Sequence, residues 1–158
     1  MIRETAVALG VLIEILAILI ANFVSLPEAI IWVGVILALT TGLVGGFVAG
    51  TFASGGWQTR AVHGLLTGLI GGLLFGVTLW FSMSLAIPRA DHSAFWGINY
   101  ALATHPIGIR QFSWLYVGNT LMLPIIFLSV VLFAAEGYIA GVAAPSSDVP
   151  QSPPTFLP

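Results

Sequence analysis

The chain contains Thr41-Gly42-Leu43-Val44-Gly45-Gly46-Phe47 and returns to almost the same heptapeptide at Thr67-Gly68-Leu69-Ile70-Gly71-Gly72-Leu73, each inside a long apolar run. Around both copies a glycine recurs at every fourth position, at Gly42, Gly46 and Gly50 and then at Gly64, Gly68, Gly72 and Gly76. In a soluble helix each glycine costs about 1 kcal/mol relative to alanine. In a bilayer, small residues let helix backbones approach closely, and this packing drives association. The repeat therefore predicts membrane helices that pack through glycine.

The composition supports a membrane protein and excludes several other functions. Hydrophobic residues make up 58% of the 158 residues and charged residues only 6%, whereas about a quarter of a soluble domain is charged. The formal charge of -2 and the lack of lysine leave no basic surface for nucleic acid. No cysteine is available for disulfides or thiolate chemistry. Because no phosphate-binding loop, dinucleotide fingerprint, nucleophile elbow or HExxH motif occurs either, we expect no enzyme activity and no cofactor.

A helix needs about 20 apolar residues to cross a bilayer. Four segments qualify, at residues 5–24, 29–53, 61–87 and 114–142. They predict an all-α, polytopic four-helix bundle over residues 1–144, with a glycine-zipper hairpin formed by the second and third helices. Residues 145–158 are rich in proline and are expected to be a flexible tail.

The connections between these spans predict their arrangement. Ser25 is expected to cap the second helix, with Pro27 in its first turn. Residues 88–113 mix polar and aromatic side chains, which is typical of an ordered segment at the membrane interface. Several side chains are expected at that interface: Trp57, Arg60, His63, Trp96, Tyr100 and Trp114.

The arginines leave the orientation almost balanced. An N-terminus in the cytoplasm places Arg3 and Arg60 inside and Arg89 and Arg110 outside. Because the first span usually dominates, we expect a multi-pass protein of the cell membrane with both termini in the cytoplasm.

A short turn near Trp57 makes the second and third spans antiparallel neighbours, and their glycines pair if the residue numbers sum to 114. Gly42 would then face Gly72, Gly46 would face Gly68, and Gly50 would face Gly64, with Gly34 extending the same strip. Leucine at Gly45 or Gly71 is expected to be tolerated better than at Gly46 or Gly68. The seam is either pure packing or a space for a lipid tail, a pigment or helix sliding. The repeat also has inverted topology, as in many transporters.

Glu14 lies near the middle of the first span, where an ionised carboxylate costs at least ~2.5 kcal/mol. It shares a helix face with Gly10, Ala17 and Ala21, so it is expected to point into the bundle. One reading is a protonated carboxyl that hydrogen-bonds a neighbour, for which the candidates are Asn119, Thr40 and Thr41. The other reading is a site for an ion, a proton or a partner's charge.

The remaining ionisable residues carry weaker signals. Glu136 is expected close enough to the end of the fourth span to reach water. Asp91, His92 and His105 could serve a surface enzyme or a metal site, but no further residue has ligand spacing. We therefore expect no metal.

The glycine pattern of residues 42–76 resembles a family of small, uncharacterised multi-pass membrane proteins common in halophilic archaea. This resemblance implies no activity. A second resemblance, to the four-span proteolipids of rotary ATPases, rests on glycine-rich helices and a buried carboxyl such as Glu136. The chain departs from those proteolipids because its glycines lie on adjacent spans and a polar segment separates spans three and four.

These observations favour a non-enzymatic integral membrane protein that packs through glycine, as an accessory subunit or a self-associating bundle in the lipid bilayer. Its expected partners are other membrane subunits or further copies of itself. The alternative is a small ion or proton channel or transporter with Glu14 on its pathway.

Overall fold

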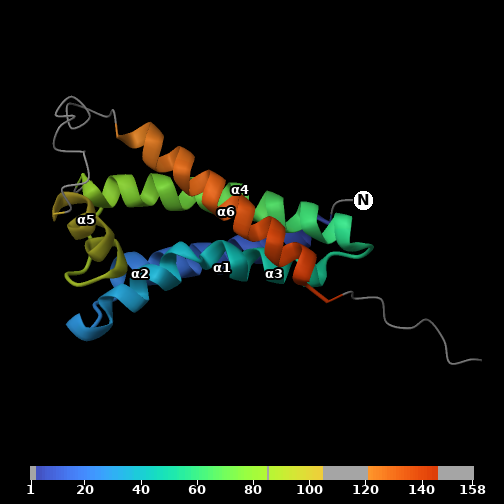
Figure 1. Ribbon diagram of the computed structural model, residues 1–158, viewed down its shortest axis with the longest axis horizontal. Helices are drawn as coiled ribbons and strands as arrows, with labels where there is room; N and C mark the ends of the chain where they lie inside the picture. The colour runs from blue at the N-terminus through green and yellow to red at the C-terminus, as the bar shows by residue number, and fades with distance from the viewer. Residues whose placement is uncertain (1–2, 85, 105–120, 146–158) are drawn as a thin grey trace, which may run out of the picture.

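The computed structural model describes residues 3–84, 86–104 and 121–145. All the regular elements within these residues are helical (Figure 1). They are α1 (Glu4–Phe23), the 3-10 turn η1 (Glu28–Ile30), α2 (Ile31–Leu39), α3 (Thr41–Phe52), α4 (Trp57–Met83), α5 (Ala94–Thr104) and α6 (Met122–Ala143). The prediction of an all-α protein is confirmed for this part of the chain.

Three helices, α1, α4 and α6, are long and apolar enough to cross a membrane. The pair of α2 and α3 meets the same test only together, and the two helices are bent by 43° relative to each other. The N-terminal end of α1 and the C-terminal end of α6 lie at the same end of the bundle (Figure 1). The beginning of the expected span 114–142 and the tail after residue 145 fall outside the described residues.

The structure divides the expected continuous span 29–53 into two helices at Thr40. This residue ends α2 with φ -102° and ψ 13°. Its hydroxyl donates to Ile36 O at 3.0 Å, and the Thr41 hydroxyl donates to Ala38 O at 2.9 Å. Hydroxyl groups that bond back to their own helix in this way bend it. The helix start also differs from expectation, because Pro27 precedes η1 and no side chain caps it.

The glycine rows of α3 and α4 pack against α6 rather than against each other. A side-chain carbon built at Gly50 would lie 2.9 Å from Gly141 Cα, and one built at Gly72 would lie 2.6 Å from Ser129 O. Gly137 of α6 lies against both Gly46 and Gly64. The closest neighbours of the remaining row positions, Gly42, Gly68 and Gly76, are also in α6. In place of the partners expected from the sum of 114, α6 supplies the nearest neighbours of these glycines, because it lies in the groove between α3 and α4.

The register follows from the residue numbers. Gly64 of α4 contacts Gly137 of α6, and Gly76 contacts Ile126. The residue numbers rise along α4 as they fall along α6, so these helices are antiparallel. Along α3 and α6 both series rise, so that pair is parallel. Small residues on both sides let the backbones meet directly.

Helix α5 closes one end of the bundle. Ser93 caps it, because its hydroxyl accepts the N–H of Trp96 at 3.1 Å. Phe95 is buried and meets Phe75 of α4 edge-on, with ring centroids 5.1 Å apart. Gly97 lies against α2, and Gly34 of α2 lies near Ala94 rather than in the α3–α4 groove.

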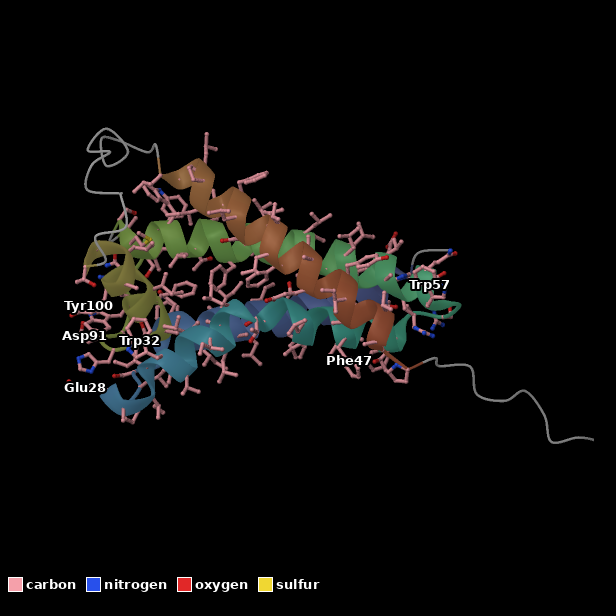
Figure 2. All side chains as sticks on the ribbon, viewed as in Figure 1. Glu28, Trp32, Phe47, Trp57, Asp91 and Tyr100 are labelled. Carbon is pink, nitrogen blue, oxygen red and sulfur yellow. The ribbon has the colours of Figure 1, made fainter. Side chains whose placement is uncertain are left out.

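Aromatic and charged side chains mark both ends of the bundle. Trp32 and Tyr100 lie at the α5 end with Glu28 and Asp91, and Trp57 lies at the opposite end (Figure 2). Aromatic rings at two ends are typical of the two membrane interfaces. The expected interfacial segment 88–113 contains α5 and, before it, the non-helical residues 88–93, and its remainder, with Trp114, lies outside the described residues.

A polar cluster fixes the α5 end. Asn22 is fully buried at the end of α1; its amide donates to Pro88 O at 3.0 Å and accepts the Ser82 hydroxyl at 2.8 Å. Arg89 donates to Ser82 O at 2.9 Å. The sequence analysis did not single out Asn22, because one amide near a helix end carries no periodic signal.

Replacing Gly68 with alanine should destabilise the fold, because the new methyl group would overlap the backbone of α6 at Phe133. Overpacking of this kind costs about 1–3 kcal/mol. Gly56→Ala is the matched control, since nothing lies within 4 Å of the added carbon. Thermal unfolding in detergent should show a large fall in Tm for Gly68→Ala only; equal values for the two variants would contradict the packing described here.

Replacing Asn22 with leucine should also destabilise the protein, because a buried polar group left without a partner costs about 1–3 kcal/mol. Ser84→Ala is the control, since Ser84 is exposed and its hydroxyl bonds only within its own helix. The same unfolding measurement applies, and an unchanged Tm for Asn22→Leu would show that the cluster is not stabilising.

Candidate functional site

Unpartnered polar atoms inside the bundle identify the candidate site. Among the described residues, the buried side-chain atoms without a hydrogen-bond partner are Glu14 Oε1 and Oε2, Glu136 Oε2, Thr67 Oγ1 and Arg60 Nε. Buried polar groups nearly always have a partner, so each exception needs a functional or structural reason. Three of these four residues lie on α1, α4 and α6 in the interior of the bundle.

Glu14 occupies a space that the repeat leaves open. Its side chain is fully buried. Its carboxyl group lies against Gly45 of α3 and takes the position that a side chain at Gly71 of α4 would need. These two residues are the first glycines of the two Gly-Gly doublets, whereas the second glycines, Gly46 and Gly72, contact α6. The doublets therefore form two notches, one for Glu14 and one for α6.

The prediction that Glu14 points into the bundle is confirmed, but its expected partners differ. The hydroxyls of Thr40 and Thr41 donate to carbonyl groups of α2. Asn119 lies outside the described residues. The expected tolerance for leucine at Gly45 and Gly71 also needs correction, because both positions are filled by the Glu14 carboxyl group.

Glu136 lies at the break between α2 and α3. Its Oε2 would be 2.8 Å from a side-chain carbon at Gly42, in the first turn of α3. The backbone N–H groups of Gly42 and Leu43 face its carboxyl group. A helix start presents partial positive charge, which favours a carboxylate there. Glu136 is half-buried, and its expected access to water stays a prediction.

The two carboxyl groups lie close enough to interact electrostatically. Glu136 contacts Gly42 and Glu14 contacts Gly45, and residues three apart are neighbours on a helix. Within the described residues neither carboxyl forms an ion pair with an arginine or histidine. The part of the site that the structure describes therefore holds two acidic groups without a compensating cationic side chain.

Thr67 adds a hydroxyl one helical turn from the Gly71 notch. It is fully buried and packs against Gly10, which itself precedes Glu14 by one turn of α1. Gly10 contacts Thr67 and, one turn later on both helices, Glu14 contacts Gly71. Helices α1 and α4 are therefore parallel here. The heptapeptide repeat contains Thr67, but nothing in the sequence alone places it beside α1.

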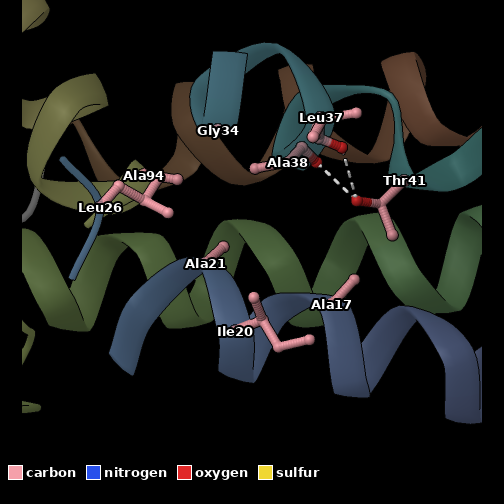
Figure 3. Close-up of a pocket in the computed structure, with 9 residues that line it drawn as sticks. All are labelled: Ala17, Ile20, Ala21, Leu26, Gly34, Leu37, Ala38, Thr41 and Ala94. Atoms are coloured by element: carbon pink, nitrogen blue, oxygen red, sulfur yellow. Dashed lines mark hydrogen bonds between the residues drawn. The ribbon is translucent and has the colours of Figure 1, made fainter. Parts of the chain in front are cut away.

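A small apolar cavity of about 190 Å³ lies on the other side of Glu14, between α1, α2 and α5 (Figure 3). Ala17 and Thr41 line it at the end nearer Glu14, and Leu26 and Ala94 line it toward α5. The Thr41 hydroxyl points to the carbonyl groups of Leu37 and Ala38 in α2 (Figure 3). The cavity thus offers no free polar group.

The other predicted site residues lie apart from this cluster. His63, expected at the membrane interface, is fully buried in the bundle; Nδ1 contacts Thr59 O at 2.7 Å and Nε2 accepts the N–H of Arg3 at 2.9 Å. Arg60 is half-buried, and Trp57 is exposed.

The candidate metal ligands are not brought together. His92 lies 3.9 Å from Glu28, at the α5 end. No group of three potential ligands could hold a metal among the described residues. His105 is outside them.

Comparisons with protein-family models, with curated proteins and with solved structures found no match to this chain. The resemblance to halophilic archaeal membrane proteins stays a prediction. The candidate site is therefore interpreted from its own geometry.

A double-mutant cycle tests the contact between Gly71 and the Glu14 carboxyl group. Gly71→Ala should destabilise the protein, because the methyl group and the Glu14 carboxyl cannot occupy the same space. In a Glu14→Ala background the same change should cost much less, with a coupling energy of about 1–3 kcal/mol between the two positions. Unfolding of all four proteins in detergent measures the cycle, and additive effects would contradict the contact.

Proposed function

We propose that this chain is a four-span integral membrane protein that binds a proton at Glu14 and Glu136 and carries protons across the membrane. The bent pair α2–α3 then counts as one crossing, and an even number of crossings agrees with the start of α1 and the end of α6 lying at the same end of the bundle. The observation that carries the proposal is the fully buried Glu14 carboxyl group, which has the half-buried Glu136 carboxyl near it and no cationic partner among the described residues.

The physical argument is the energy of charge in a bilayer. One ionised carboxylate at membrane depth costs at least ~2.5 kcal/mol, and two adjacent carboxylates repel each other. A single proton on the pair removes one charge and supplies a hydrogen-bond donor. Release and uptake of that proton then change the charge of the site by one unit, as a proton carrier requires.

The surrounding helices fit this proposal. A helix broken at membrane depth, whose new start faces an acidic group, is a recurring feature of ion sites in transporters. Here the break at Thr40 directs the start of α3 toward Glu136. The inverted repeat in α3 and α4 is shared with the same class of proteins. Both features support a transport role without identifying the ion.

The alternative function is an accessory subunit or a self-associating bundle. It depends on glycine surfaces that remain free for a partner. The glycine rows of α3 and α4 are already covered by α6, so they offer little surface for that purpose. The proposed location remains the cell membrane, with both termini in the cytoplasm.

Glu14→Gln tests the transport role, because it keeps the shape of the side chain and removes its titratable proton. Purified protein in vesicles with a pH-sensitive dye inside should conduct protons when a potential is applied. Glu14→Gln should reduce the flux to the leak of protein-free vesicles while the helical circular dichroism stays unchanged. Glu4→Gln, at the exposed start of the same helix, is the matched control and should conduct normally.

Flux that survives in Glu14→Gln would contradict the proposal. A protein without flux that copurifies with a stable membrane partner in mild detergent would favour the accessory subunit instead.

A further inference from the structure

The environment of Glu14 differs on its two sides along the bundle. Toward α5 lies the apolar cavity, whose lining residues supply no free polar group. Toward the chain termini lie Thr67 and then His63, both fully buried on α4. His63, Thr67 and Gly71 are spaced four residues apart, so they share one face of α4.

The Thr67 hydroxyl is the polar group nearest to the notch on this face. Side-chain carbons four residues apart on a helix are about 5–6 Å apart. The Glu14 carboxyl group takes the place of a side-chain carbon at Gly71. The Thr67 side chain and the Glu14 carboxyl group thus lie about one helical turn apart along the same face of α4, a separation that suits a bridge of one water molecule.

The hydrogen-bonding state of Thr67 supports a role beyond packing. Threonine in a membrane helix usually bonds back to its own carbonyl groups, as Thr40 and Thr51 do here. Thr67 Oγ1 has no such bond within the described residues, although it is fully buried. A buried hydroxyl without a partner is costly unless water or another group completes it.

The path continues toward the termini at His63. Its Nδ1 is bonded to Thr59 O and its Nε2 accepts the N–H of Arg3. This buried imidazole keeps the terminal end of α1 attached to α4, one turn from Thr67. By contrast, a cavity lined by apolar groups stays dry.

We infer that Glu14 exchanges its proton with the end of the bundle that carries the chain termini, through the Thr67 hydroxyl, and that the apolar cavity toward α5 is not the route. This inference rests on the proposed proton site at Glu14 and adds its route of access.

The proton transfer balances as follows. Thr67 Oγ1 accepts a proton from a hydronium ion on the terminal side, which is left as water, and releases its own hydroxyl proton to the bridging water. That water passes a proton to the Glu14 carboxylate. Every O–H bond that breaks is matched by one that forms, and no oxidant or reductant is needed.

The exchange of hydrogen for deuterium at Glu14 tests the route without measuring flux. The C=O stretch of a protonated carboxyl shifts in D₂O, and Glu14→Gln assigns the band. Thr67→Val keeps the shape of the side chain and removes the hydroxyl, so exchange should slow by about tenfold, the equivalent of losing one hydrogen bond. Thr67→Ser restores a hydroxyl and should restore the rate.

Two controls separate this route from other causes. Thr51→Val removes a hydroxyl that bonds within α3 and should leave exchange unchanged. Ala21→Leu fills the apolar cavity and should also leave it unchanged.

The outcomes separate the route from the proton site. An unchanged rate in Thr67→Val, or slow exchange in Ala21→Leu with a normal fold, would overturn the route and leave the proton site standing. If no carboxyl band disappears in Glu14→Gln, both the route and the proton site are overturned.

Discussion

Two adjacent glycines on each of two antiparallel helices determine how the bundle is assembled. Because consecutive residues on a helix point about 100° apart, each doublet opens two notches. Gly46 and Gly72 admit the backbone of α6, while Gly45 and Gly71 admit the carboxyl group of Glu14. A single methyl group at any of these four positions would meet an occupied space. The packing of α6 and the placement of the acidic side chain therefore depend on the same short repeat.

The sequence predicted much of the fold, because hydropathy and glycine spacing are local signals. It predicted helices, the apolar runs that form α1, α4 and most of α6, and close packing through glycine. It did not predict the partner of the glycine rows, because matching glycines on neighbouring spans favour a direct contact between α3 and α4. Gly137 and Gly141 of α6 were not counted, although they complete the contact. The bend at Thr40 depends on the hydroxyl groups of Thr40 and Thr41, which donate hydrogen bonds to carbonyl groups of α2. The periodicity of the sequence does not reveal these hydrogen bonds.

The candidate site was predicted in part. Glu14 could be placed in the bundle because its small neighbours at helical spacing mark an inward face. Its closeness to Glu136 and Thr67 could not be predicted, since these residues are distant in sequence and meet only through the packing of α1, α4 and α6. His63 was predicted at the interface because it follows Arg60 near a loop. Its burial comes from the hydrogen bond with the backbone of Arg3, a contact between residues far apart in the sequence.

The position of α6 in the chain has a consequence for biosynthesis. The glycine groove between α3 and α4 is filled by α6, a helix that leaves the ribosome after both of them. Until α6 is inserted, the groove between α3 and α4 exposes its glycine backbone to the membrane. Another helix with small residues could bind in this groove. Completion of the fold is thus a late step, and a chain truncated before Met122 would be a substrate for membrane quality control.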